Sequence, residues 1–168
     1  MKELIFVVMV AGGIYYFWSH HQHAQATEAS KPLEIKDPIY SEVHVNLSYH
    51  GKSIEAVVLA KTANQAECDK YSTEILKYLP ASSQQGLHWT MLSSECKPVL
   101  DSRKEKLFDN KPSYVAYISA SPGNKMEREL RWIYWGMTAD ESEKICGFVK
   151  EMQQGWTGTV QCIHHMPT

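Results

Sequence analysis

The first 26 residues constrain this chain most, because they decide in which compartment it folds and therefore what its four cysteines can do. An uncharged run of 15 residues, Leu4–Trp18, follows the charged start and precedes a polar stretch. Such a run is either threaded across a membrane or removed during export. In both cases we expect the remaining chain to lie on the far side, where disulfides persist.

Two interpretations of this leader stay open. As a membrane anchor, residues 4–18 are shorter than the roughly 20 apolar residues that a bilayer core requires, but the aromatic residues 15–18 suit a membrane interface. As a cleavable signal peptide, Ala24 and Ala26 supply a small-x-small cleavage pattern. Either way, the chain divides into three parts. They are a leader with a polar exit (1–26), a short tether (27–38) and an exported α+β domain (39–168).

Charge and length narrow the function classes. With 17 basic and 19 acidic residues the net charge is only −2, and no long block of like charge occurs. A surface for nucleic acid is therefore not predicted, and the membrane is expected to be contacted only through residues 4–18. The roughly 140 residues after the leader suffice for one domain with a core of its own.

Hydrophobic periodicity predicts six strands and two helices. Val43, Val45 and Leu47 alternate with polar residues, as in a strand with one buried face. The tetrapeptides TANQ (62–65) and TADE (138–141) read as capping boxes, with Thr62 and Thr138 as the N-caps. The predicted elements are strands at 42–49, 53–61, 89–96, 113–119, 129–136 and 157–163, and helices at 62–79 and 138–155.

Strand, helix and strand thus follow one another twice, with one cysteine in each helix and one in each following strand. We interpret this pattern as an internal pseudo-repeat. The predicted fold is an α+β, ferredoxin-like two-layer sandwich, in which two helices cover one face of a mostly antiparallel sheet.

Four cysteines permit three pairings. In a helix-on-sheet unit the helix runs antiparallel to the strand that follows it, and the levels of Cys146 and Cys162 then match. The same geometry joins Cys68 to Cys96. We therefore predict two structural disulfides, each worth about 3 kcal/mol by the chain-entropy model. A redox role is not favoured, because the sequence has no Cys-x-x-Cys.

Aromatic residues give the first candidate binding site. Trp132 and Tyr134 share one face of the strand at 129–136, and Ile133 and Trp135 share the other. If one face of the sheet is open, Trp132, Tyr134 and Tyr117 would form a binding face for a glycan or for a partner's apolar side chains. The alternative is that the segment 98–112 or the N-terminal strand covers these rings as a second small core.

Histidines give the second candidate. His164, His165 and Met166 near the C-terminus could bind a metal ion, since imidazole with thioether suits copper. The alternative is a polar, exposed tail, and we predict neither a metal nor a cofactor. No catalytic motif occurs in the sequence, so we expect a non-catalytic protein.

The stretch RWIYWGMTADESEKICGFVKEMQ (131–153), a strand, a glycine turn and a helix, resembles the sporulation-related-repeat (SPOR) domains. This resemblance implies a peptidoglycan-binding domain of the bacterial envelope. The chain departs from that family at Met137 and Thr138, where an aromatic residue is usual. Our first expectation is a periplasmic protein-interaction module tethered to the inner membrane. The alternative is a peptidoglycan- or glycan-binding module that uses the aromatic sheet face.

Overall fold

The computed structural model describes residues 31–49, 51–78, 88–152 and 156–164. The predicted leader at 4–18, the cleavage pattern near Ala26 and the first part of the tether lie outside the described residues. Within the described ranges, no helix has the length and apolar character needed to cross a membrane.

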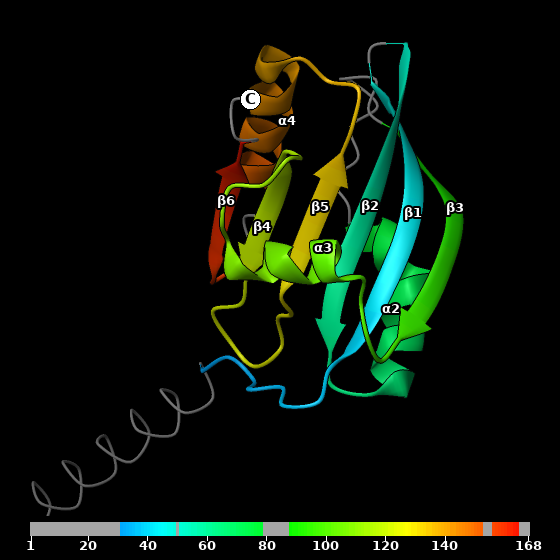
Figure 1. The fold of residues 1–168 in the computed structure, drawn as a ribbon, viewed down its shortest axis with the longest axis vertical. Coiled ribbons are helices and arrows are strands. Elements are labelled where there is room, and N and C mark those ends of the chain that lie inside the picture. The colour runs from blue at the N-terminus through cyan, green and yellow to red at the C-terminus, as the bar shows by residue number, and fades with distance from the viewer. Residues whose placement is uncertain (1–30, 50, 79–87, 153–155, 165–168) are drawn as a thin grey trace, which may run out of the picture.

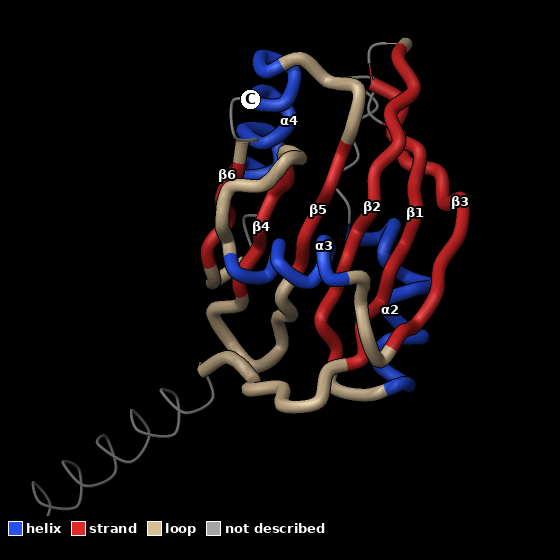
Figure 2. Tube along the Cα trace, in the orientation of Figure 1, coloured by secondary structure: helices blue, strands red, loops and turns tan. Residues whose placement is uncertain are grey.

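One antiparallel sheet of six strands organises the domain (Figures 1 and 2). Its strands are β1 (Ile39–Tyr49), β2 (Lys52–Thr62), β3 (His88–Lys97), β4 (Tyr117–Ser121), β5 (Leu130–Tyr134) and β6 (Thr159–Ile163). The helical elements are α2 (Gln65–Tyr78), α3 (Ser102–Glu105), the 3-10 turn η2 (Lys106–Asp109) and α4 (Ala139–Met152). The predicted α+β class and the antiparallel sheet are confirmed.

The strand order β3-β1-β2-β5-β4-β6 divides the sheet into two halves. In each half a hairpin is followed by a helix and by a strand that pairs with the first strand of the hairpin, β3 with β1 and β6 with β4. The halves meet where β2 pairs with β5. The two halves therefore have the same order of elements.

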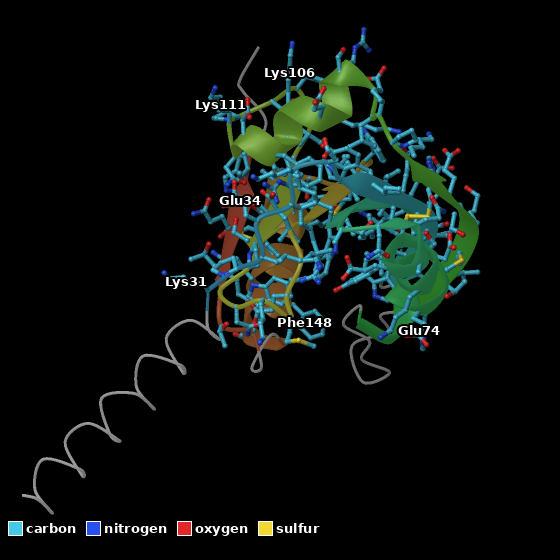
Figure 3. The ribbon with its side chains drawn as sticks, turned by 90° about the horizontal axis from the view of Figure 1, so that it is seen from below. Lys31, Glu34, Glu74, Lys106, Lys111 and Phe148 are labelled. Atoms are coloured by element: carbon cyan, nitrogen blue, oxygen red, sulfur yellow. A yellow bond between two sulfur atoms is a disulfide. The ribbon has the colours of Figure 1, made fainter. Side chains whose placement is uncertain are left out.

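The longer helices cover one face of the sheet and the short elements cover part of the other. Figure 3 shows α2 and α4, which carry Glu74 and Phe148, on one side, and α3–η2 with Lys106 on the other. We call these sides the α2/α4 face and the α3 face. The α3–η2 segment lies within the predicted excursion 98–112 and adds a third layer, so the predicted two-layer sandwich is incomplete.

Each face has its own apolar core. Beneath α2 and α4, alternate residues of the strands pack against Ile145, Cys146 and Val149 of α4. On the α3 face, Leu100 and Leu107 pack against Tyr117 and Ile133 of the sheet. Period-2 alternation in the strands supplies both cores at once, because successive side chains point to opposite faces.

Both predicted disulfides are confirmed. Cys68 pairs with Cys96 at a Cα–Cα distance of 6.0 Å, and Cys146 pairs with Cys162 at 5.9 Å. All four cysteines are thus used, and each bridge ties a helix to the strand that follows it.

The second capping box is confirmed and the first is displaced. The amide of Thr138 donates to the carboxylate of Glu141 at 2.9 Å, and the Glu141 amide donates back to the Thr138 hydroxyl at 3.3 Å. Helix α2 is capped by Asn64, whose side chain accepts from the Glu67 amide at 2.9 Å. The prediction of Thr62 as N-cap was therefore wrong. Its hydroxyl donates instead to a backbone carbonyl at the start of β1.

A buried arginine fixes α3–η2 on the sheet. The side chain of Arg131 in β5 is 0% exposed. It donates to the backbone oxygens of Leu107 at 2.8 Å and Phe108 at 3.1 Å, and it pairs with Glu129 at 2.6 Å. The guanidinium also stacks over the Phe108 ring, 4.6 Å from its centroid. Arg131 thus adds donors at the end of this 3-10 turn, where the Leu107 oxygen also accepts from the Asn110 amide at 3.2 Å.

Candidate functional site

The three aromatic rings of the predicted binding face are buried. Trp132 is 4% exposed and Tyr134 is 7% exposed, both beneath the helices of the α2/α4 face. Tyr117 is 0% exposed on the α3 face, where its hydroxyl donates to the backbone oxygen of Lys111 at 2.8 Å. Both faces are covered at these positions, so the prediction that these three rings form an exposed binding face was wrong.

Two other aromatic side chains are largely exposed among the residues that the structure describes. Trp135 is 43% exposed and Tyr114 is 65% exposed. Trp135 follows β5 directly, and its amide still donates to the backbone oxygen of Glu55 in β2 at 3.3 Å. Alternation therefore places its ring on the α3 face. Strand β5 ends beyond the part of the sheet that α3 crosses (Figure 1). Gly136, at φ +77°, then turns the chain toward α4.

A groove on the α3 face crosses the sheet beside Trp135. We call it the cross-sheet groove; its volume is about 420 Å³. It is lined by His44, Val45, Glu55, Ala56, Val57, Leu92, Ser93 and Trp135. These residues come from β3, β1 and β2 and from the end of β5, so the groove runs across neighbouring strands from the β3 edge inward.

A β-bulge places an apolar side chain at the outer end of this groove. His44 pairs with Ser93 while Val45 pairs with Met91, so Leu92 is an extra residue in β3. Its side chain is 56% exposed. The cross-sheet groove therefore has a large exposed apolar side chain at each end, Leu92 on β3 and Trp135 after β5.

A buried ion cluster lies beside the same groove. Glu42 in β1 is 2% exposed; it pairs with Lys104 of α3, with Lys97 at 3.3 Å and with the His44 ring at 2.9 Å. Burial alone would raise the pKa of Glu42, but the hydrogen bonds from Lys104 and His44 outweigh burial and hold that pKa below its usual value. The cluster joins α3 to β1 and orients His44, whose side chain is 41% exposed at the groove.

A second hollow lies on the other side of Trp135. We call it the Tyr114–Trp135 hollow, and its volume is about 380 Å³. Its polar lining comes from Tyr134, Thr138, Ser142 and His164, beside the two exposed rings. The described lining residues include no lysine, arginine, aspartate or glutamate.

Of the predicted metal candidates, the structure describes only His164. His164 is exposed, and its ring nitrogen lies 3.4 Å from the carboxylate of Glu143 at the surface. His165 and Met166 lie outside the described residues. Among residues that the structure does describe, no group of three or more histidine, cysteine or acidic side chains is placed to hold a metal ion.

The sequence contains a partial signal for the exposed rings. The alternation in 129–136 already separates Trp135 from Trp132, and the glycine at 136 marks the end of the strand. The missing information is how far α3–η2 extends over the sheet, because this contact joins residues far apart in the sequence.

Comparisons with protein-family models, with curated proteins and with solved structures find no match to this chain.

Proposed function

We propose that this chain is an exported protein-interaction module of a bacterial envelope assembly, tethered to the inner membrane by residues 4–18 and facing the periplasm. It acts without catalysis and docks a partner protein on the cross-sheet groove. Two disulfides that use all four cysteines support an oxidising compartment. The apolar run at the N-terminus supports the tether.

The observation that carries the docking proposal is the pair of exposed apolar side chains at the ends of the groove. Leu92 and Trp135 are 56% and 43% exposed, although apolar surface of this size is costly in water. Tryptophan is also the residue type most enriched at energetic centres of protein interfaces. Polar groups of Glu55 and Ser93 beside these side chains suit the polar rim of such an interface.

The position of the groove fits a tethered module. In Figure 1 the described chain starts at the bottom, at residue 31, whereas β5 points upward and Trp135 follows its upper end. A tether that leaves from the bottom directs the opposite end of the domain away from the membrane. The groove would then be presented to partners in the periplasm.

The buried charges support a binding role because each has an internal structural partner. Glu42 holds α3 to β1, and Arg131 holds η2 to β5. Glu127 accepts from the Gly123 amide at 2.6 Å and from the Thr157 amide at 2.7 Å, which joins two loops. These groups rigidify the sheet on which the groove lies.

We further propose that the domain arose by duplication of a ferredoxin-like strand–helix–strand unit. The shared order of elements in the two halves and the equivalent disulfides support this proposal. The two halves should then superpose on each other about an axis between β2 and β5.

Site-specific photocrosslinking in intact cells tests the docking proposal. A photoreactive phenylalanine analogue at Leu92 should capture a partner protein, and Trp135→Ala should abolish that crosslink. The matched control is Met126, which is 77% exposed in the β4–β5 connection, away from the groove. Equal capture from positions 92 and 126, or capture that persists in Trp135→Ala, would refute docking on the groove.

A further inference from the structure

We propose that the Tyr114–Trp135 hollow binds an uncharged sugar ring. This site shares Trp135 with the cross-sheet groove but has otherwise different lining residues, and the inference does not rest on the docking of a protein in the groove. Tyr114 and Trp135 are the aromatic residues among the exposed large hydrophobic side chains of the described chain, and both line this hollow. Their convergence on one hollow is the observation that carries the proposal.

The size of the hollow suits a small ligand. Its volume of about 380 Å³ falls within the range of roughly 300 to 1,000 Å³ that is typical of small-molecule sites. It lies between the segment that precedes β4, the end of β5 and the start of α4. Its walls therefore come from residues 114–116, from the continuous stretch 134–142 and from His164 after β6.

Three polar side chains of the hollow are hydroxyls that are fixed in place. The hydroxyls of Tyr134 and Ser142 are hydrogen-bonded to each other at 2.9 Å. Burial raises the pKa of Tyr134, which keeps its hydroxyl protonated. Thr138 is held by the capping box, its hydroxyl 3.1 Å from the Glu141 carboxylate. A site with fixed positions loses little conformational entropy on binding.

This combination matches the chemistry of a pyranose. One face of a sugar ring presents C–H groups, which pack against the face of an aromatic ring, while its hydroxyls need hydrogen-bond partners around the edge. The exposed rings supply the first requirement, and the hydroxyls together with the His164 ring supply the second. The absence of lysine, arginine and carboxylates from the described lining favours an uncharged sugar over a charged one.

The test is a titration of the full-length protein, kept in a detergent without a sugar headgroup, with two probes. Tri-N-acetylchitotriose carries acetamido groups and cellotriose does not, and saturation-transfer NMR reports which ring contacts the protein. We expect saturable binding of at least one probe. Trp135→Ala and Tyr114→Ala should each weaken it by about tenfold, because each removes one aromatic contact.

Matched variants separate this site from the groove and from misfolding. Tyr114→Phe keeps the ring and should retain binding, while Leu92→Ser alters only the cross-sheet groove and should leave sugar binding unchanged. Trp135→Phe tests the same position with an aromatic ring preserved. The proposal is overturned if neither probe shows binding at a probe concentration of about 10 mM. This is well above the Kd of roughly 1 mM that a weak site would have. It is also overturned if folded Trp135→Ala and Tyr114→Ala bind the probe as well as the wild type.

Discussion

Replacing Arg131 should destabilise the domain far more than replacing an exposed arginine, because Arg131 is buried and holds α3–η2 on the sheet. Arg131→Met removes the guanidinium and keeps a long apolar side chain in its place. The backbone oxygen of Phe108 and the carboxylate of Glu129 then lose this donor, and the backbone oxygen of Leu107 keeps the Asn110 amide at 3.2 Å. The cation–π contact with the Phe108 ring is lost as well.

The expected cost follows from the hydrogen bonds that are broken. A hydrogen bond to a charged group contributes about 1.5 to 3 kcal/mol, and breaking a buried ion pair by removal of one partner costs about 3 to 5 kcal/mol. These contributions overlap at one side chain, and the methionine recovers some apolar burial. We therefore expect the free energy of unfolding to fall by about 3 kcal/mol.

Urea denaturation of the full-length protein under oxidising conditions measures this loss. The matched control is Arg103→Met, because Arg103 lies exposed in α3, and exposed charges contribute little to stability. Amide hydrogen exchange adds a local measurement, in which residues 103–109 should lose protection before β5 does. A loss below about 1 kcal/mol for Arg131→Met, or equal losses for the two variants, would refute the role assigned to Arg131.

Three further predictions concern the loops and the disulfides. Burial alone would raise the pKa of Glu127, but its hydrogen bonds outweigh burial and keep that pKa below its value in the unfolded chain. The stabilisation by Glu127 is therefore fully present above the unfolded pKa and is lost as the pH falls through the folded pKa. Urea denaturation should therefore show that Glu127→Gln loses less stability than the wild type between pH 7 and pH 3, roughly the window around the unfolded pKa of about 4.3. The same loss in both proteins would contradict this role. A Cβ at Gly158 would lie 1.8 Å from the backbone oxygen of Ser121 at the end of β4, so Gly158→Ala should destabilise the domain by more than about 1 kcal/mol. A Cβ at Gly147 in helix α4 would meet nothing within 4 Å, so Gly147→Ala should raise the melting temperature. Equal effects of Gly147→Ala and Gly158→Ala would refute the close backbone approach at Gly158. Replacing Cys146 and Cys162 together by serine should cost about 3 kcal/mol, since their bridge spans 16 residues, and calorimetry that finds no loss would refute a structural role.

Local sequence rules were sufficient where the deciding contacts are close in the chain. The pairing of Cys146 with Cys162 followed from the direction of a helix and of the strand after it. The capping box at Thr138 followed from a tetrapeptide alone. The first box failed because Thr62 and Asn64 are both good N-caps, and the end of β2 extends to Thr62.

The candidate site needed information that alternation does not contain. A period of two assigns Trp132 and Trp135 to opposite faces, but it does not say which parts of each face are covered. Coverage of the α3 face depends on Arg131, which contacts η2 at a separation of 23 to 24 residues. Trp135 lies beyond that cover and Tyr117 lies beneath it, so one aromatic residue is exposed and the other is buried.

The most direct test of the central proposal is crosslinking and purification of the full-length protein from intact envelopes, followed by mass spectrometry without reduction. The wild type and Trp135→Ala are compared side by side. We predict that both proteins carry the bridges Cys68–Cys96 and Cys146–Cys162, and that only the wild type retains a specific partner protein. Free thiols in the exported protein, or the same neighbours recovered with both proteins, would contradict an exported docking module that binds through the cross-sheet groove.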